Sequence, residues 1–244
     1  MATILVIGAN RGLGLGFVER YLESGDDVIA TYRNEDSSFD LIKMSNERSN
    51  LKLLQLDVSS NKSLNSFAEN LGNLPIDIFI NNAGVYGPRN SSFGNVDEEN
   101  WMPAIKVNAI APILITQLII KNIRSGADKK LIYITSKMGS IDDNKGGGAY
   151  VYRSSKTALN AVVKSLSVDL ENEGIIVALI HPGWVKTDMG GPNALIDKDM
   201  SVSGMIKVIS NLDISSTGNF YNYDGSIIPW WAMKIRKWLH LKNK

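Results

Sequence analysis

A phenol and an amine with complementary acid-base chemistry are four positions apart in the chain, at Tyr152 and Lys156. The surrounding residues follow a helical pattern, so both side chains project from one face and can meet the same ligand. A free tyrosine titrates near about 10, and a nearby ammonium favours the phenolate and lowers that pKa. The spacing therefore predicts an acid-base group, Tyr152, whose pKa is lowered by Lys156. Tyr150 has no such partner, because its fourth neighbour is Ser154.

A hydroxyl that can work with this pair is at Ser136, directly after a short β-branched run. It can donate a hydrogen bond to a substrate oxygen on which negative charge develops. A tyrosine and a lysine at this spacing are, by themselves, more typical of an exposed helical pair. Their combination with Ser136 and with a glycine loop near the start of the chain favours an active site.

That glycine loop follows the first apolar run and reads Gly8-Ala-Asn10-Arg11-Gly12-Leu13-Gly14. It opens a helix, so its backbone N–H groups and the positive helix end can hold a pyrophosphate. Glycine is needed where a side chain would collide with such a ligand. An ordinary turn is the alternative, but the place of the loop at the first strand-helix junction favours a dinucleotide site.

Short apolar runs alternate with helical patterns along the chain, which predicts buried parallel strands joined by crossover helices. Strands are expected at residues 3–7, 28–32, 51–56, 76–80, 131–135 and 175–180, with a seventh near 219–223. Helices are expected at 13–24, 60–72, 98–124 and 150–173, and a loop at 188–202. The pattern predicts a doubly wound α/β fold of Rossmann type with a parallel seven-stranded sheet. One domain is expected, over residues 1–230 of the 244.

Composition narrows the class of protein further. There is no cysteine, which excludes disulfides and thiolate metal sites, and two histidines are too few to suggest a metal centre. A net charge of +1 gives no reason to expect nucleic-acid binding. The first residues lack the features of a signal peptide, and no apolar stretch is predicted to span a bilayer. A cytoplasmic protein without a metal is expected, with His181 in a structural role.

The glycine loop and four later landmarks together resemble the short-chain dehydrogenase/reductase family, in its single-domain branch, from Ile4 to about Trp230. The spacing G-x-x-x-G-x-G is that of the family's cofactor loop, although Ile7 stands where the family usually has a threonine whose hydroxyl helps to hold the turn. The later landmarks, which occur in the family's order, are Asp57-Val58, Asn81-Asn-Ala83-Gly84, Ser136 and Tyr152-Arg-Ser-Ser-Lys156.

The resemblance implies an NAD(P)-dependent oxidoreductase and assigns roles to its residues. Tyr152 would be the acid-base group, Ser136 would orient the substrate oxygen, and Lys156 would also hold the nicotinamide ribose. Asn108 would support a water-linked proton path, and the Asp57 carboxylate would bind the adenine amino group. The residues expected to contact the cofactor are Gly8, Asn10, Arg11, Gly12, Leu13, Gly14, Arg33, Asp57, Val58, Asn81, Ala83, Gly84, Tyr152, Lys156, Pro182, Gly183, Val185 and Thr187.

The end of the second predicted strand, Ala30-Thr-Tyr-Arg33, bears on the choice between NAD and NADP. An acidic residue at that place would bind the ribose 2′-hydroxyl of NAD, whereas an arginine accommodates the 2′-phosphate of NADP. No acid occurs at the expected position, and Arg33 together with Arg11 favours NADP(H), because guanidinium groups bind phosphate oxygens. Glu35 or Asp36 could still reach a ribose, so NAD(H) stays open, as does a reading of both arginines as solvated surface residues.

Three segments narrow the resemblance to sniffer-type carbonyl reductases and the related bacterial C-factor proteins: residues 181–194, 201–205 and 222–230. Such relatives reduce aldehydes and ketones with NADPH or are reported as intercellular signalling proteins. The resemblance therefore implies reduction of a small carbonyl compound, an aldehyde, ketone or quinone, to an alcohol. An NADP(H)-binding signalling or redox-sensing protein is the alternative, and the intact Ser136, Tyr152 and Lys156 favour the enzyme.

Residues 231–244 form a tail with five basic residues and no acidic one. The apolar residues of this tail fall near one face of a helix, which predicts a basic amphipathic helix. Docking of the tail on the body or on a partner subunit is favoured over peripheral membrane contact. By analogy with the family, the long helices at 98–124 and 150–173 would form a homodimer or homotetramer.

Overall fold

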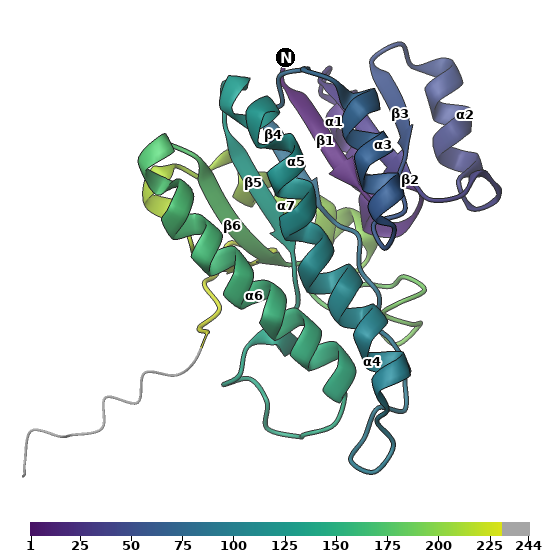
Figure 1. The fold of residues 1–244 in the computed structure, drawn as a ribbon, viewed down its shortest axis with the longest axis vertical. Coiled ribbons are helices and arrows are strands. Elements are labelled where there is room, and N and C mark those ends of the chain that lie inside the picture. Colours follow the sequence, from purple (N-terminus) through teal and green to yellow (C-terminus); the bar gives the residue numbers. More distant parts are fainter. Residues whose placement is uncertain (231–244) are drawn as a thin grey trace, which may run out of the picture.

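The computed structural model describes residues 1–230, in which seven parallel strands form one sheet with helices on both faces (Figure 1). The strand order is β3-β2-β1-β4-β5-β6-β7. The strands are β1 (Thr3–Ile7), β2 (Asp27–Tyr32), β3 (Leu51–Gln55), β4 (Ile78–Asn81), β5 (Lys130–Ile134), β6 (Ile176–His181) and β7 (Phe220–Asn222). The predicted doubly wound sheet of Rossmann type is confirmed, and each strand boundary lies within two residues of its prediction.

The helices include two that the sequence pattern did not predict, α2 and α7. The helices are α1 (Gly12–Glu23), α2 (Phe39–Glu47), α3 (Asn61–Leu71), α4 (Glu98–Ile105), α5 (Ala111–Ser125), α6 (Tyr150–Leu170) and α7 (Lys198–Ser210). The predicted loop at 188–202 is therefore wrong in its last residues, where α7 has already begun. The Asp197 side chain accepts from the Met200 N–H and caps this helix. Val202 and Met205 bury its inner face.

The predicted long helix at 98–124 is two helices, α4 and α5, joined by a π-helical turn at Lys106–Ile110. By length and composition it is the one helical run in residues 1–230 that could cross a membrane, with a mean hydropathy of 1.6. Ile115, Ile119 and Ile123 are fully buried in the core on the face of the sheet that α5 covers. This packing accounts for the apolar composition of the run.

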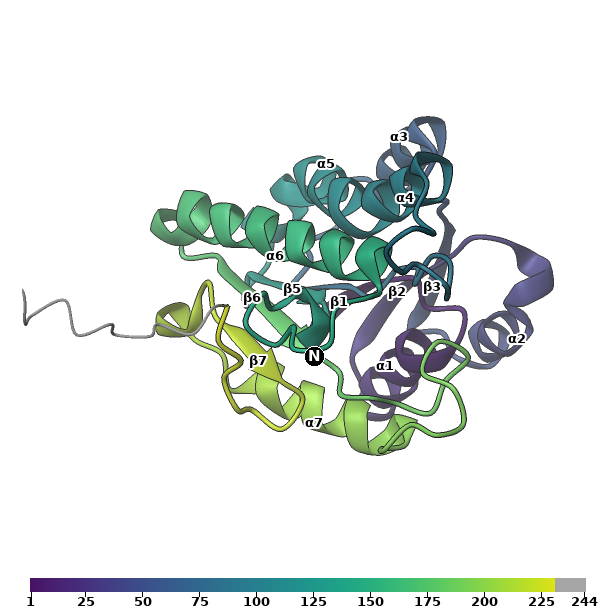
Figure 2. The same cartoon turned by 90° about the horizontal axis from the view of Figure 1, so that it is seen from below.

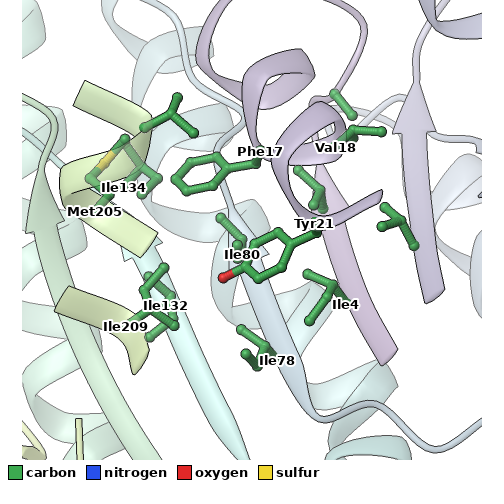
Figure 3. Packing of buried hydrophobic residues seen from close by; sticks show 14 of the residues in the cluster. Ile4, Phe17, Val18, Tyr21, Ile78, Ile80, Ile132, Ile134, Met205 and Ile209 are labelled. Atoms are coloured by element: carbon green, nitrogen blue, oxygen red, sulfur yellow. The ribbon is translucent and has the colours of Figure 1, made fainter. Parts of the chain in front are cut away.

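The helices divide between the two faces of the sheet, with α1, α2 and α7 on one side and α3, α4, α5 and α6 on the other (Figure 2). Successive side chains of β1 alternate between the two cores: Ile4 and Val6 face α1, and Leu5 and Ile7 face the opposite side. Because both faces are covered, the strands read as continuous apolar runs. In the first core, Phe17 of α1 packs among strand isoleucines and residues of α7 (Figure 3).

The strand order reverses between β1 and β4, which lie side by side in the middle of the sheet. In open parallel sheets the ligand crevice lies at this reversal, beyond the carboxyl ends of the strands. The glycine loop follows β1, residues 82–84 follow β4, Ser136 comes soon after β5, and Pro182 follows β6. The sheet therefore brings most of the predicted site residues to one edge.

The predicted tail helix at 231–244 lies outside the described residues.

The second core depends on Phe79, which is fully buried in β4 and packs edge-on against Tyr133 with ring centroids 5.9 Å apart. We expect Phe79→Ala to lower the free energy of unfolding by about 3–5 kcal/mol, because the core closes only partly around the deleted ring. Urea denaturation measures the change. Phe39→Ala is the matched control, since the Phe39 side chain is 75% exposed, and should change stability by less than about 0.5 kcal/mol. Equal effects of the two substitutions would contradict this account of the core.

Candidate active site

The glycine loop turns sharply between β1 and α1, and backbone crowding explains two of its glycines. Gly8 has φ +75° and Gly12 has φ +56°, in the left-handed region that favours glycine. A Cβ on Gly14 would overlap the Gly8 carbonyl oxygen, and a Cβ on Gly8 would come within 2.9 Å of Ala83 Cα. The loop therefore packs directly on the segment that follows β4.

Two side chains hold this turn, from the strands on either side of β1. Thr31 was not predicted as a site residue, and Asn82 was expected only as part of the landmark at residues 81–84. The Gly8 N–H donates to Thr31 Oγ1 at 3.0 Å, and Asn82 Nδ2 donates to the Gly8 carbonyl at 2.8 Å. Thr31 is buried in β2 and Asn82 directly follows β4. Thr31 and Asn82 thus hold the turn with hydrogen bonds that the apolar side chain of Ile7 cannot make. Thr31 was visible in the sequence only as a hydroxyl within an otherwise apolar run.

The polar residues of the loop point toward different partners. Asn10 Nδ2 donates to the Ser37 carbonyl at 3.0 Å, just beyond β2. Arg11 pairs with Asp188 at 2.7 Å, and both side chains are more than two-thirds exposed. Leu13 is half-buried against the core on the α1 side. The glycine loop is thus linked both to the end of β2 and to the loop that follows β6.

Arg33 and Asp57 share the corner beyond β2 and β3. The Ser59 hydroxyl and N–H donate to Asp57 Oδ1 at 2.7 and 2.9 Å and hold the pKa of that carboxyl below its usual range. The positive charge of exposed Arg33 contributes in the same direction, which places the two residues near one another. Val58 is half-buried against the core on the α5 side.

The segment after β4 contains a buried donor and a crowded glycine. Asn81 is fully buried, and its Nδ2 has no hydrogen-bond partner within residues 1–230. A Cβ on Gly84 would come within 3.2 Å of Asn108 Oδ1 and 3.4 Å of Lys156 Nζ. A buried donor without a partner is unusual in a folded protein, and a bound ligand can supply the missing acceptor. Asn81, Gly84 and the glycine loop are thus compatible with a bound dinucleotide.

Asn108 lies in the π-helical turn and joins three elements. Its Nδ2 donates to the Val85 carbonyl at 2.7 Å and to Ser155 Oγ at 2.8 Å, while the Val85 N–H donates to its Oδ1 at 2.8 Å. Both amide hydrogens are used, so the side chain fixes α6 against the segment after β4. π-helical turns of this kind often occur at functional sites.

The structure places Ser136, Tyr152 and Lys156 around the carboxyl end of β5, and all three side chains are buried. Burial raises the pKa of Tyr152 to about 12, and a hydrogen bond with the Ser136 side chain offsets part of this rise. Burial also lowers the pKa of Lys156 to about 8, while its Nζ donates to the Ile134 carbonyl at 3.0 Å. The pKa of Tyr152 thus moves in the direction opposite to the one predicted from its spacing to Lys156. Loss of solvent outweighs any effect of the amine.

Asn160 positions the Ser136 side of the site and was also not predicted. Thr135 Oγ1 donates to Asn160 Oδ1 at 2.6 Å, and Asn160 Nδ2 donates to the Gly139 carbonyl at 3.1 Å. These bonds join α6 to both sides of Ser136. The available sequence signal was that Asn160 comes four residues after Lys156, which places it on the same helix face.

The turn after β6 folds back over the glycine loop. The Pro182 carbonyl accepts from Ser201 Oγ at 2.6 Å, and Gly183 has φ +84°. Val185 is buried and forms a bridge with Ile196. The methyl carbon of Thr187 lies 3.8 Å from the place of a Cβ on Gly12. Thr187 of this turn therefore lies beside Gly12 of the glycine loop.

His181 and Trp184 flank this turn. Burial lowers the pKa of His181 to about 4, so its ring is neutral at physiological pH. Trp184 is half exposed, and its indole N–H donates to the Gly190 carbonyl at 2.8 Å. Neither side chain brings a charge to this turn.

Tyr86, which was not singled out from the sequence, contacts the acid-base candidate directly. Its ring stacks on the Tyr152 ring, with centroids 4.5 Å apart and an interplanar angle of 22°. The Arg89 guanidinium lies 5.7 Å from the centre of the Tyr86 ring. No spacing rule links Tyr86 to Tyr152, because Tyr86 lies in the loop after β4 and Tyr152 lies in α6.

We expect Gly14→Ala to destabilise the glycine loop strongly, because the added methyl group would overlap the Gly8 carbonyl. Thermal unfolding without any ligand should show a fall in Tm of several degrees, as an overpacking cost of about 1–3 kcal/mol predicts. Gly146→Ala is the matched control, because a Cβ there meets nothing within 4 Å. A Gly14→Ala protein as stable as the control would show that the loop relaxes freely.

Comparisons with known proteins agree with this geometry. A family model described as short chain dehydrogenase matches residues 2–195. The C-signal protein of Myxococcus xanthus is 43% identical over 167 residues, which are 68% of this chain and 100% of that protein. The carbonyl reductase Sniffer of D. melanogaster has a TM-score of 0.89 at 32% identity, over 94% of this chain and 100% of its own.

A second solved structure, the NADPH-bound carbonyl reductase from chicken fatty liver, has a TM-score of 0.88 at 33% identity, and the match covers 94% of each chain. The family match and these relatives confirm the resemblance that the motifs indicated. The protein is an NAD(P)-dependent oxidoreductase and belongs to the short-chain dehydrogenase family.

Proposed function

We propose that this protein uses NADPH to reduce a small carbonyl compound, an aldehyde, ketone or quinone, to an alcohol, with Tyr152 as the proton donor. The observation that carries the proposal is the buried group of Ser136, Tyr152 and Lys156 at the edge of the sheet where the glycine loop lies. The solved relatives include carbonyl reductases, one of them with bound NADPH.

The residues that would hold the cofactor follow the carboxyl ends of the strands, around the reversal of strand order between β1 and β4. The glycine loop would present its backbone N–H groups and the start of α1 to a pyrophosphate, and Asn81 Nδ2 is a buried donor with no hydrogen-bond partner within residues 1–230. Arg33 offers a guanidinium group just beyond the end of β2, which favours the 2′-phosphate of NADP over NAD, whereas the Arg11 guanidinium pairs with Asp188 in the loop after β6. Val185 and Thr187 would meet the nicotinamide end. When bound, the reduced cofactor supplies a hydride for the carbonyl carbon.

The protein residues would manage the charge and the proton at the carbonyl oxygen. Ser136 donates a hydrogen bond to that oxygen as it becomes negative. Tyr152 then transfers its phenolic proton to it. A pKa of about 12 keeps this phenol protonated at neutral pH, as an acid requires. The Lys156 ammonium stabilises the phenolate left behind, and Asn108 keeps α6 in register with the segment after β4.

The similarity to the C-signal protein supports one alternative, a signalling or redox-sensing protein that binds NADP(H) without turning over a substrate. Such a protein would need the glycine loop but not the three buried side chains at the end of β5. A cytoplasmic location and a homodimer or homotetramer stay predictions.

Turnover tests the proposal directly. We expect wild-type protein to oxidise NADPH in the presence of at least one member of a panel of small aldehydes, ketones and quinones, and to do so faster than it oxidises NADH. Tyr152→Phe should reduce kcat by about 10²–10⁴-fold, because the proton donor is lost. Absorbance at the nicotinamide band measures the rate. Tight NADPH binding without any turnover would favour the signalling alternative instead.

The pH dependence tests the role of Lys156. With a pKa of about 8, Lys156 is protonated below that pH and loses its charge as the pH rises above it. We therefore expect kcat/KM for NADPH to be level at low pH and to fall about tenfold per pH unit above 8. Lys156→Met should be slow at every pH and lack this fall. If Lys156→Met shows the same fall in kcat/KM above pH 8, the fall belongs to the titration of another group.

A further inference from the structure

Tyr86 is held in a fixed place by anchors on both sides of it in the chain. On one side, Val85 makes two hydrogen bonds with the Asn108 side chain, of 2.7 and 2.8 Å. On the other, Gly87 has φ +76°, and a Cβ there would come within 2.8 Å of a Val151 methyl group on α6. The ring of Tyr86 then stacks on Tyr152, one residue further along α6. The contacts that fix α6 against the segment after β4 therefore also fix the position of Tyr86.

Arg89 connects this segment to the loop after β6. Its guanidinium lies over the Tyr86 ring at 5.7 Å, and Nη2 donates to the carbonyls of Asp188 and Met189 at 3.1 and 3.3 Å. Within residues 1–230 it makes no ion pair, because the Asp188 carboxylate pairs with Arg11. The guanidinium charge is thus used to join an aromatic ring to two backbone carbonyls about 100 residues away in the chain.

The loop that Arg89 contacts is ordered by its own hydrogen bonds. The Gly190 N–H donates to Thr187 Oγ1 at 3.2 Å, and the Gly191 N–H donates to the Thr187 carbonyl at 2.8 Å. Thr187 in turn lies beside Gly12. A movement of residues 188–189 would therefore move Thr187, which belongs to the turn that we expect at the nicotinamide end of the cofactor.

We propose that Tyr86 and Arg89 are positioning residues: Tyr86 holds the Tyr152 ring in its reactive orientation, and Arg89 links that orientation to the seating of the loop after β6. This proposal rests on the proposed function, since Tyr152 must be the proton donor. The stacked rings of Tyr86 and Tyr152 and the Arg89 guanidinium thus form a continuous set of contacts from the proton donor to the loop after β6. Tyr86 acts through Tyr152, not on the substrate.

Kinetics of two Tyr86 variants test the first half. Tyr86→Phe keeps the stacked ring and should leave kcat within about threefold of wild type, whereas Tyr86→Leu should lower kcat by roughly tenfold to a hundredfold. The dissociation constant of NADPH should change by less than about twofold in either variant. In a Tyr152→Phe background, Tyr86→Leu should have little further effect, because both act on one step. An unchanged kcat in Tyr86→Leu, or a rise in the carbonyl KM alone, would overturn the positioning role.

Ring-current shifts test the same contact without turnover. The ring protons of Tyr152, assigned with Tyr152→Phe, should be shifted by the stacked Tyr86 ring in wild type and in Tyr86→Phe. In Tyr86→Leu they should move back toward the values of an unstacked tyrosine. Identical spectra of Tyr86→Leu and wild type would show that the stack does not exist in solution.

Amide hydrogen exchange tests the second half. Arg89→Leu should increase exchange at Gly190 and Gly191 several-fold, and Arg48→Leu, at another exposed arginine, should leave it unchanged. Unchanged exchange in Arg89→Leu would overturn the link to the loop. The exchange and ring-current measurements need no substrate, so a failure of the Tyr86 or Arg89 contacts is distinguishable from a failure of wild type to reduce any carbonyl compound, which would overturn the proposed function on which this proposal rests.

Discussion

The Tyr152 phenol and the Lys156 ammonium are both withdrawn from water on the inner face of α6. Burial disfavours the charged form of each group, so it raises the pKa of Tyr152 to about 12 and lowers that of Lys156 to about 8. A polar group removed from water needs a partner in the protein. Ser136 supplies one for the phenol, and the Ile134 carbonyl supplies one for the amine. The rest of the site is arranged to bring these partners to α6.

Two buried asparagines hold α6 where these contacts are possible. Asn108 joins it to the segment after β4, and Asn160 joins it to both sides of Ser136. Each carboxamide has partners for both its oxygen and its nitrogen, and a satisfied buried network of this kind is rigid. The π-helical turn is the local departure from regular helix that contains Asn108. Accurate placement of a proton donor depends on such rigidity.

The cofactor side of the site depends on close backbone packing instead of on buried charge. Because β1 and β4 are neighbours, the glycine loop touches Ala83, and Thr31 and Asn82 hold its turn. These contacts follow from the strand order. The order reverses between β1 and β4, and parallel sheets bind ligands at such a reversal. The two sides of the site meet at Gly84, beside Asn108 and Lys156.

Local signals in the sequence determined the strands, the glycine loop and the shared helix face of Tyr152 and Lys156. The apolar run of a buried strand and a spacing of four in a helix are properties of neighbouring residues, so they need no knowledge of the fold. Helices α2 and α7 were not predicted from these local signals. α2 buries only Leu41, and α7 is recognisable mainly by its cap at Asp197 and its packing on α1.

Only the tertiary structure decided the pKa of Tyr152, the support of the glycine turn by Thr31 and Asn82, and the contact of Tyr86 with Tyr152. Each depends on residues that are far apart in the chain and meet through the sheet order and through α6. Desolvation in particular sums over every neighbour of a group, whereas the spacing to Lys156 identifies just one of them. The sequence therefore indicated which groups can react, and the packing around them decided their protonation and their orientation.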